Sequence, residues 1–344
     1  MRARHSLLSF LAATLSVATL VACGSTGEDG PSEAADAGYP VSIDRCDRTI
    51  TVENRPERIV SLNQASTEIL LSLGVADRMV GTASWTDPIL DSLADENAKV
   101  ERLADQAPSY EAVLATEPDL ITASLYNTLS EGGVATAEQF ADLGVPAYLS
   151  AVECEKSDFG GGDGARDEPI TMESIYTEIT DLATLVDEQQ AGQDLIDDLA
   201  DRMDAAVSAA PDVDGVTVLY WFANSESPYV GGCCGGPGIA THALGLTNVF
   251  EGQNAEWPQI GWEAIADADP DVLVIGDLTR KSQTAETAAA KIEYLESNPV
   301  TKEMTAVKEK QYVTVAGAEL NPSIRTVDLV EQMSAGLVEL GLAK

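Results

Sequence analysis

The chain contains 344 residues, of which 44% are hydrophobic, and its 57 Asp and Glu residues against 20 Lys and Arg residues give a formal net charge of −37. Such a charge repels nucleic acid and anionic lipid, so the composition excludes nucleic-acid binding and charge-driven membrane binding. At roughly 100 to 200 residues per domain, the length predicts two lobes with sizeable hydrophobic cores.

Residues 1–22 have the pattern of a lipoprotein signal peptide. Arg2 and Arg4 precede an apolar run over residues 7–21, and this run is shorter than the ~20 residues that a membrane-spanning helix needs. The small residues before Cys23 suit a signal peptidase that cuts immediately ahead of a lipid-modified cysteine. The alternative is an ordinary secretory signal that happens to end near a cysteine.

Cleavage would make Cys23 the lipid-bearing N-terminus, with acyl chains such as palmitate. It would leave 322 residues with a net charge of −39, because Arg2 and Arg4 are lost. Residues 23–39 are rich in small and acidic residues and lack an apolar face, so we expect a flexible tether. The sequence thus predicts a protein that a lipid anchors to the outer face of the cytoplasmic membrane.

Four more cysteines, Cys46, Cys154, Cys233 and Cys234, would face an oxidising exterior, where disulfide pairing is the default. Four cysteines allow three connectivities. Cys46 and Cys154 fall in the first half of the chain and the other two are adjacent, so we favour one bridge in the first half and one vicinal disulfide. The alternative is a thiolate metal site. We predict no metal site, because His242 is the one histidine of the mature chain.

Residues 40–170 are predicted to form a first α/β lobe, in which short apolar runs alternate with helical patterns. A helix over residues 67–73 ends at Gly74, and the polar, glycine-rich stretch 157–168 predicts a loop. The predicted strands are residues 41–52 with a turn at 44–48, 58–62, 79–83, 120–123 and 145–149, and a second helix is predicted near 135–143.

One unit of the sequence occurs twice. Residues 110–120 and 262–272 each contain an aromatic residue, a Glu-Ala pair and a Pro-Asp pair at equal spacing. Proline cannot continue a helix, and continuous apolar runs follow at 120–123 and 272–275, as strands buried on both faces require. The repeat predicts two α/β lobes of like construction. The alternative is coincidence between two common helix-to-strand turns.

Residues 171–210 are predicted to be a helical connection, because apolar residues recur there at helical spacing. As one helix, residues 188–209 would span roughly 33 Å at 1.5 Å per residue, which is long enough to brace two lobes. Two packed helices inside one lobe are the alternative. Residues 211–344 then form the second lobe, with predicted strands at 216–221, 272–275 and 312–316 and a helix at 239–244.

Together these patterns resemble the lipid-anchored substrate-binding proteins of ABC importers for iron siderophores, haem and cobalamin. The resemblance covers nearly the whole mature chain and rests on residues 58–62, 67–70 and 73–74, the two Pro-Asp units, Trp257-Pro258-Gln259-Ile260 and Asn298-Pro299. It implies an α/β fold of two Rossmann-like lobes joined by one long rigid α-helix, with the ligand cleft between the lobes. It also implies a non-enzymatic monomer that docks on an ABC permease, which works with an ATPase, through Glu101 and Glu263.

Open α/β sheets bind ligands at the carboxyl ends of their strands. The candidate residues there are Asn63, Gln64, Trp85 and Tyr126 in the first lobe and Trp221, Phe222, Asn224, Cys233, Cys234, Arg280 and Arg325 in the second. The aromatic rings suit a large ring or a catecholate, although core packing is the alternative for each. Arginine can hold a carboxylate, phosphate or catecholate oxygen in a bidentate grip, and Arg325 resembles the cleft arginine of the family.

A vicinal disulfide would make the Cys233-Cys234 loop a rigid apolar platform below the ligand, although a purely structural turn is the alternative. Most members of the family lack this cysteine pair. The enzymatic alternative for the whole chain is a thiol-redox lipoprotein that uses Cys233 and Cys234, because common hydrolase, metalloprotease and P-loop motifs are absent from the sequence. A structural or adhesion lipoprotein is a third possibility.

A ferric siderophore is the leading ligand, with cobalamin, haem and a phosphorylated deazaflavin coenzyme precursor as alternatives. Haem needs an axial ligand, for which Tyr126 and His242 are the candidates. Import of manganese or zinc is disfavoured, because one histidine cannot supply a nitrogen-rich site.

Overall fold

The computed structural model describes residues 38–160, 163–280 and 284–342, which belong to one compact unit. The predicted signal peptide, Cys23 and nearly all of the predicted tether lie outside the described residues. Among the residues that are described, no helix is long and apolar enough to cross a membrane.

The first lobe is built on a parallel sheet of five strands in the order β5-β4-β3-β6-β7. A separate antiparallel hairpin precedes it, with β1 at Val41–Arg45 and β2 at Arg48–Val52. The strands of the sheet are β3 (Ile59–Ser61), β4 (Met79–Ala83), β5 (Arg102–Ala104), β6 (Leu120–Ala123) and β7 (Ala147–Leu149). The helices of the lobe are α1 (Gln64–Ser72), α2 (Ala94–Asn97), α3 (Tyr110–Leu114) and α4 (Ala137–Ala141).

The second lobe repeats this plan. Its sheet has the parallel order β10-β8-β11-β12, and the short strand β9 pairs antiparallel with β8. The strands are β8 (Thr217–Ala223), β9 (Tyr229–Val230), β10 (Thr247–Asn248), β11 (Val272–Asp277) and β12 (Tyr312–Ala316). The helices are α7 (Gly236–Leu244), α8 (Trp262–Ala268), α9 (Ala288–Ser297), α10 (Thr305–Glu309) and α11 (Thr326–Glu339).

The duplicated Pro-Asp unit has the same structural role in both lobes. α3 leads into the buried strand β6, and α8 leads into β11. The carboxylate of Asp119 accepts hydrogen bonds from the backbone N–H groups of Glu57 and Arg58, at 2.8 and 2.9 Å, just before β3. Asp271 accepts one from the N–H of Thr217, at 2.8 Å, at the start of β8. Each Pro-Asp aspartate therefore fixes the beginning of the neighbouring central strand.

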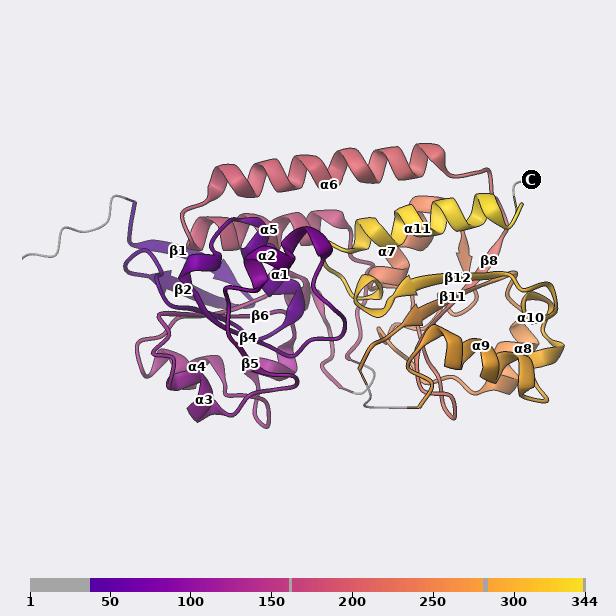
Figure 1. Ribbon diagram of the computed structural model, residues 1–344, viewed down its shortest axis with the longest axis horizontal. Helices are drawn as coiled ribbons and strands as arrows, with labels where there is room; N and C mark the ends of the chain where they lie inside the picture. Colours follow the sequence, from indigo (N-terminus) through magenta and orange to yellow (C-terminus); the bar gives the residue numbers. More distant parts are fainter. Residues whose placement is uncertain (1–37, 161–162, 281–283, 343–344) are drawn as a thin grey trace, which may run out of the picture. The chain divides into compact units, whose positions relative to one another are not determined.

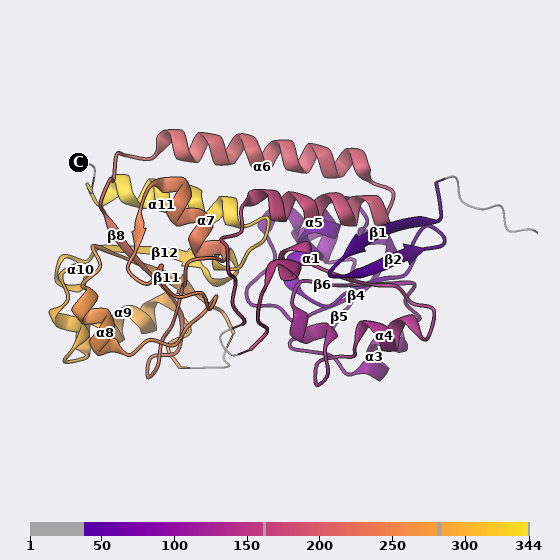
Figure 2. The same ribbon diagram turned by 180° about the vertical axis from the view of Figure 1, so that it is seen from behind.

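Helices α5 (Met172–Leu185) and α6 (Gln189–Ala209) connect the lobes. α5 packs on the first lobe, whereas α6 packs on both α5 and α11 and runs along the same side of the two lobes (Figure 1). Figure 2 shows the same arrangement from behind. The predicted single helix over 188–209 is therefore confirmed within one residue, and it contacts elements of both lobes.

The hydrophobic core lies on both faces of each sheet. One cluster fills the space between the sheets on one side and helices α5, α6, α7 and α11 on the other. It includes Leu182, Leu199 and Val330. A second cluster fills the opposite face of the first sheet, around Phe140, and a third fills the corresponding face of the second sheet, around Trp221 and Trp262. Burial on both faces explains why β6 and β11 are continuous apolar runs.

Several predicted boundaries differ from the structure, each for a local reason. The helix predicted at 67–73 begins three residues earlier, at Gln64, directly after Asn63, whose extended backbone marks the N-terminal end of the helix. The strand predicted at 145–149 begins only at Ala147, since Pro146 has no N–H to donate to a sheet. The helix predicted at 135–143 is shorter, because Thr136 and Gln139 form a capping box that starts α4 at Ala137.

Candidate ligand-binding site

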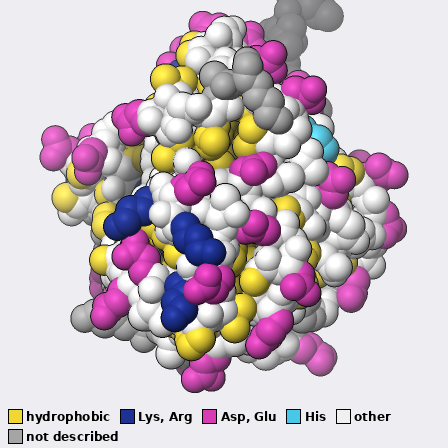
Figure 3. Space-filling view, turned by 90° about the vertical axis from the view of Figure 1, so that its right-hand side faces the viewer, with side chains coloured by type: hydrophobic (Ala, Val, Ile, Leu, Met, Phe, Trp, Pro, Cys, Tyr) yellow, Lys and Arg dark blue, Asp and Glu magenta, His cyan; other side chains and the backbone are white. Residues whose placement is uncertain are grey.

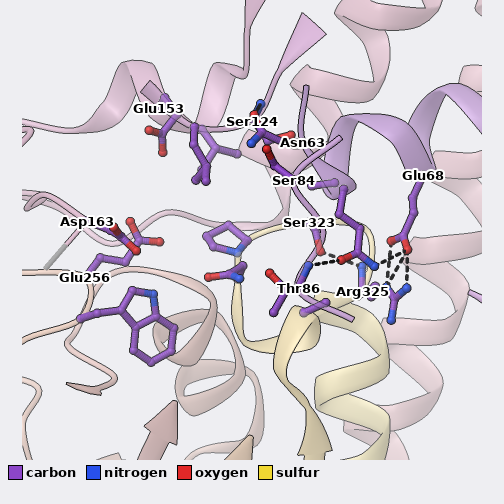
Figure 4. A pocket seen from close by; sticks show the side chains of 18 of the residues that line it. Asn63, Glu68, Ser84, Thr86, Ser124, Glu153, Asp163, Glu256, Ser323 and Arg325 are labelled. Carbon is purple, nitrogen blue, oxygen red and sulfur yellow. Dashed lines mark hydrogen bonds and ion pairs between the residues drawn. The ribbon is translucent and has the colours of Figure 1, made fainter. Parts of the chain in front are cut away.

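A pocket of about 80 Å³ lies between the two lobes, at the carboxyl ends of several strands. Its side chains come from both lobes, and Figure 4 shows them facing one another. Residues after β3, β4, β6 and β7 form one wall, and the segment before α8 together with the segment between β12 and α11 forms the other. The prediction that the strand ends face a shared cleft therefore agrees with where the pocket lies.

At one end of the pocket, an ion pair joins the lobes. Nε of Arg325 donates to the two carboxylate oxygens of Glu68 at 2.8 and 3.0 Å, and Nη2 donates to the same carboxylate and to the carbonyl of Pro88 at 2.7 Å. Both side chains are buried. Burial alone would lower the pKa of Arg325, but the hydrogen bond to Glu68 and its charge outweigh burial and raise the pKa. The guanidinium therefore remains charged.

Asp87 makes a second contact between the lobes, near that ion pair. Its carboxylate accepts hydrogen bonds from the backbone N–H groups of Ala318, at 2.6 Å, and Thr279, at 3.1 Å. Burial raises the pKa of Asp87, and these two hydrogen bonds oppose the shift. Asp87 comes from the first lobe and both donors come from the second, so this carboxylate bridges the lobes.

At the other end of the pocket, two carboxylates share two cations. Nζ of Lys156 lies 2.6 Å from Glu153 of the first lobe and 3.2 Å from Glu256 of the second. Behind them, the fully buried guanidinium of Arg166 lies 3.8 Å from Glu153 and 3.4 Å from Glu256. Burial raises the pKa of Glu153, while Lys156 opposes that shift. Figure 4 shows Glu153 and Glu256 at the end of the pocket away from Arg325.

Backbone hydrogen bonds support this end of the pocket. The N–H of Arg166 donates to the carbonyl of Asn254 at 3.0 Å, and the N–H of Glu256 donates to that of Gly164 at 2.8 Å. The N–H of Ile170, two residues before α5, donates to the carbonyl of Cys234 at 3.2 Å. Residues 164 and 166 of the predicted loop are thus held against the second lobe.

Trp257 supplies the aromatic surface of the pocket. It is 2% exposed, lines the pocket and stacks on Phe222, with ring centroids 4.8 Å apart and an interplanar angle of 27°. The guanidinium of Arg280 lies 5.0 Å from the Phe222 centroid and makes an ion pair with Glu286. Phe222 and Arg280 therefore support Trp257 and do not line the pocket themselves.

Of the residues predicted from sequence to bind ligand, Asn63, Gln64 and Arg325 line the pocket. The side chains of the first two already make structural hydrogen bonds. Oδ1 of Asn63 accepts from the N–H of Ser124 at 2.9 Å, and Oε1 of Gln64 accepts from the N–H of Thr86 at 2.9 Å. These residues shape the pocket wall.

The structure does not bring the three predicted aromatic residues together at one opening. Trp221 lies in the core of the second lobe, where its ring packs edge-on against Trp262, and Trp85 lies in the first lobe below the guanidinium of Arg102. Each indole N–H already has a partner, which is Thr82 for Trp85 and the carbonyls of residues 223 and 224 for Trp221. Trp85, Trp221 and Phe222 are all absent from the pocket lining.

Two other predicted residues lie at turns or at the rim. Asn224 adopts a left-handed conformation, and its side chain accepts from the N–H of Glu226 at 2.9 Å, so it forms a turn away from the pocket. Tyr126 is 39% exposed and stacks on Phe159, with centroids 3.9 Å apart. This pair lines a smaller depression beside the main pocket.

The structure contains two disulfides among the described residues. Cys46 and Cys154 join the β1–β2 hairpin to the 3-10 helix η4 (Ala151–Glu155), which precedes Lys156. Cys233 and Cys234 form a vicinal disulfide before α7. The vicinal pair does not line the pocket. It contacts the segment before α5, since the carbonyl of Cys234 accepts a hydrogen bond from the N–H of Ile170.

Sequence reasoning missed most of the residues that define the pocket. Glu68, Lys156, Glu256 and Trp257 had no assigned ligand role, because their significance comes from partners on the other lobe. Trp257 had one available signal, since it belongs to a segment that carries the family resemblance. In the described part of the chain, no group of His, Cys, Asp and Glu side chains is arranged to hold a metal ion.

Comparison with known proteins agrees with this architecture. The family model described as "Periplasmic binding protein" matches residues 59–317. A cobalamin-binding protein of Halobacterium salinarum is 25% identical over 97% of this chain and 84% of its own length. An ABC transporter substrate-binding lipoprotein of Bacillus subtilis, itself uncharacterised, is 25% identical over 76% of this chain and 78% of its own length.

A solved structure shows the same fold. A periplasmic binding protein from Veillonella parvula superposes with a TM-score of 0.74 at 22% identity, covering 86% of this chain and 97% of the other. The fold, the position of the pocket between two like lobes and the family model, which spans both lobes, lead to one conclusion. The chain belongs to the periplasmic binding protein family.

Proposed function

We propose that the chain is the extracytoplasmic solute-binding protein of an ABC importer, and that it captures an organic metal chelate and delivers it to a permease. The single observation that carries this proposal is the pocket at the strand ends, whose walls come from both lobes. Such a pocket can open and close around a ligand, because polar contacts between the lobes hold its two ends, whereas the hydrophobic cluster that the lobes share includes the connecting helices α5 and α6.

The size of the pocket bears on how it would bind. Its volume is about 80 Å³, whereas pockets for drug-sized ligands usually measure about 300–1,000 Å³. A chelate of siderophore or corrinoid size therefore requires the lobes to separate. The ion pair of Glu68 with Arg325 and the contacts of Asp87 would break on opening, and the long helix α6 would limit the movement, since it packs on both α5 and α11.

A ferric siderophore is the leading candidate ligand, and cobalamin is the second, supported by the name of the Halobacterium relative. Haem is less well supported, because His242 lies exposed on α7 and outside the pocket lining, which leaves Tyr126 at the rim as the remaining candidate axial ligand. The deazaflavin precursor has no specific contact in its favour.

For docking on the permease we propose an exposed glutamate on each lobe. Glu263 lies in the first turn of α8, and Glu101 lies just before β5. The sequence repeat offers Glu111 as a second candidate in the first lobe, because it occupies the same place in α3 as Glu263 does in α8. α3 and α8 both lie on the side of their lobes away from α6 (Figure 1). On the face of the second lobe seen in Figure 3, acidic side chains are widely spread.

The predicted anchor completes the proposal. A lipid on Cys23 would keep the protein at the outer face of the cytoplasmic membrane, close to its permease and ATPase. Glu263 could then reach the permease without the protein diffusing through free solution. Metabolic labelling with palmitate tests this point, because a Cys23→Ala variant should incorporate none.

A thermal screen over metal chelates tests the proposed function. A ligand that binds the folded state stabilises it by RT ln(1 + [L]/Kd), about 2.7 kcal/mol at a hundredfold excess over Kd. Ferric siderophores or corrinoids should raise the melting temperature. The protein should neither oxidise dithiols nor reduce disulfides at a measurable rate. A redox lipoprotein using Cys233 and Cys234 would give the opposite pattern.

A further inference from the structure

We propose, on the basis of the function above, that this pocket selects an uncharged or cationic metal chelate and rejects an anionic one. The ferric tris-catecholates and the dicarboxylate porphyrins belong to the rejected class, whereas ferric hydroxamates and corrinoids belong to the accepted class. The proposal rests on the charges that line the pocket and on the partners that those charges already have.

The lining of the pocket is negative. Glu68, Glu153, Asp163 and Glu256 contribute carboxylates, whereas Lys156 and Arg325 are the cationic side chains among the described lining residues. Figure 4 shows Asp163 beside Glu256, at the end where Glu153 also lies.

Both cations of the lining are already paired. Nζ of Lys156 lies 2.6 Å from Glu153 and 3.2 Å from Glu256, and Arg325 is held by Glu68. Separation of the lobes already breaks the pair of Arg325 with Glu68, but Lys156 and Glu153 both belong to the first lobe, so an anionic ligand would have to draw Lys156 away from Glu153. Glu153 would then keep Arg166, at 3.8 Å, but its buried carboxylate would lose the nearer of its two cations, which is unfavourable.

The rest of the wall suits a ligand without negative charge. Trp257, Leu125, Val152 and Pro322 present apolar surface, and Asn321 adds an uncharged amide. These groups can contact the apolar faces and amide groups of a chelate without displacing Lys156 from its carboxylates. Beyond the pocket, the net charge of −37 acts in the same direction, because it lowers the local concentration of any anion.

Two ferric chelates of similar size and opposite charge test the proposal: a cationic trihydroxamate and a trianionic tris-catecholate. Their dissociation constants would be measured from the quenching of tryptophan fluorescence at low and at high ionic strength. We expect the cationic chelate to bind at least about tenfold more tightly at low salt. Added salt should weaken its binding and strengthen that of the anion, because salt screens both the attraction and the repulsion.

A matched pair of variants separates the pocket from the net charge. Asp163→Asn removes a carboxylate from the lining, and Asp187→Asn removes one from the turn between α5 and α6. Both residues are exposed and have a positive φ, 61° and 60° respectively, which asparagine tolerates. Asp163→Asn should weaken binding of a chelate with one positive charge by about threefold, the effect of one unit charge several ångströms away in water, and should strengthen binding of the trianion. Asp187→Asn should leave the preference unchanged.

The possible outcomes are distinct. Equal affinities, or tighter binding of the tris-catecholate, would overturn the charge selectivity while leaving the chelate-binding function in place. Equal effects of the two variants would overturn the assignment of that selectivity to the pocket. Binding of neither chelate, nor of a corrinoid, would overturn the proposed function and this inference with it.

Discussion

Replacing Arg325 by glutamine should destabilise the protein through the carboxylate that it leaves behind. Glu68 is 1% exposed, and its oxygens accept hydrogen bonds from Nε of Arg325 at 2.8 and 3.0 Å. Removing one partner of a buried ion pair typically costs about 3–5 kcal/mol, because the other charge remains buried. The expected loss in the free energy of unfolding for Arg325→Gln is therefore about 3–5 kcal/mol.

A double variant isolates this cause. In Glu68→Gln/Arg325→Gln both partners are neutral amides, so the free energy of unfolding should return to within about 1–2 kcal/mol of the native value. Arg202→Gln is the matched control. Arg202 also pairs with two carboxylates, Asp328 and Glu331, but its side chain is 36% exposed, so its loss should cost about 1 kcal/mol or less.

Urea denaturation followed by tryptophan fluorescence and circular dichroism gives these free energies. A loss below about 1 kcal/mol for Arg325→Gln would refute the reasoning, since the pair could not then be a buried tie between the lobes. A double variant less stable than Arg325→Gln would refute it as well, because the unpaired carboxylate of Glu68 would then not be the source of the loss.

Three further predictions concern pH, the long-range disulfide and docking. Burial raises the pKa of Glu178 to about 8, above its value of about 4.3 in an unfolded chain, so the folded state holds a proton that the unfolded chain releases and stability falls as pH rises between these values. Glu178→Gln should therefore gain stability relative to the native protein between about pH 5 and pH 8 in denaturation curves, and a constant difference would contradict this. Cys46→Ser/Cys154→Ser opens a link across a sequence separation of 108 and should lower the free energy of unfolding by about 2–5 kcal/mol, whereas no change would show that the unfolded chain is not constrained by it. Glu263→Ala should retain full chelate binding in solution but reduce uptake by cells, and loss of binding would show that the residue has another role.

Features fixed by local sequence were predictable. The long helix α6 follows from the helical spacing of its apolar residues, and the duplicated Pro-Asp unit predicts two like lobes. The sequence could not reveal why aspartate follows proline. The structure shows that Asp119 and Asp271 each bind the start of a neighbouring strand more than 50 residues away along the chain.

The candidate site was harder to predict, because its residues acquire their roles from the opposite lobe. Arg325 was predicted to grip an anion, but in the structure Glu68 already holds it. Trp221 was predicted near the cleft, but alternate side chains of a buried strand point to opposite faces, and its side chain points into the core. Lys156 directly precedes the predicted polar loop, and nothing in the sequence singled it out, because its role depends on Glu256 of the second lobe.

Equilibrium binding to the native protein and to Trp257→Leu tests the central claim most directly, because leucine keeps an apolar side chain but removes the aromatic face that lines the pocket. Calorimetric titration with a ferric hydroxamate and with a corrinoid should show binding of one chelate per chain, weakened by about tenfold or more in the variant. Binding that is equally tight in both proteins would place the ligand elsewhere. No binding of any ferric, corrinoid or porphyrin chelate would contradict the account.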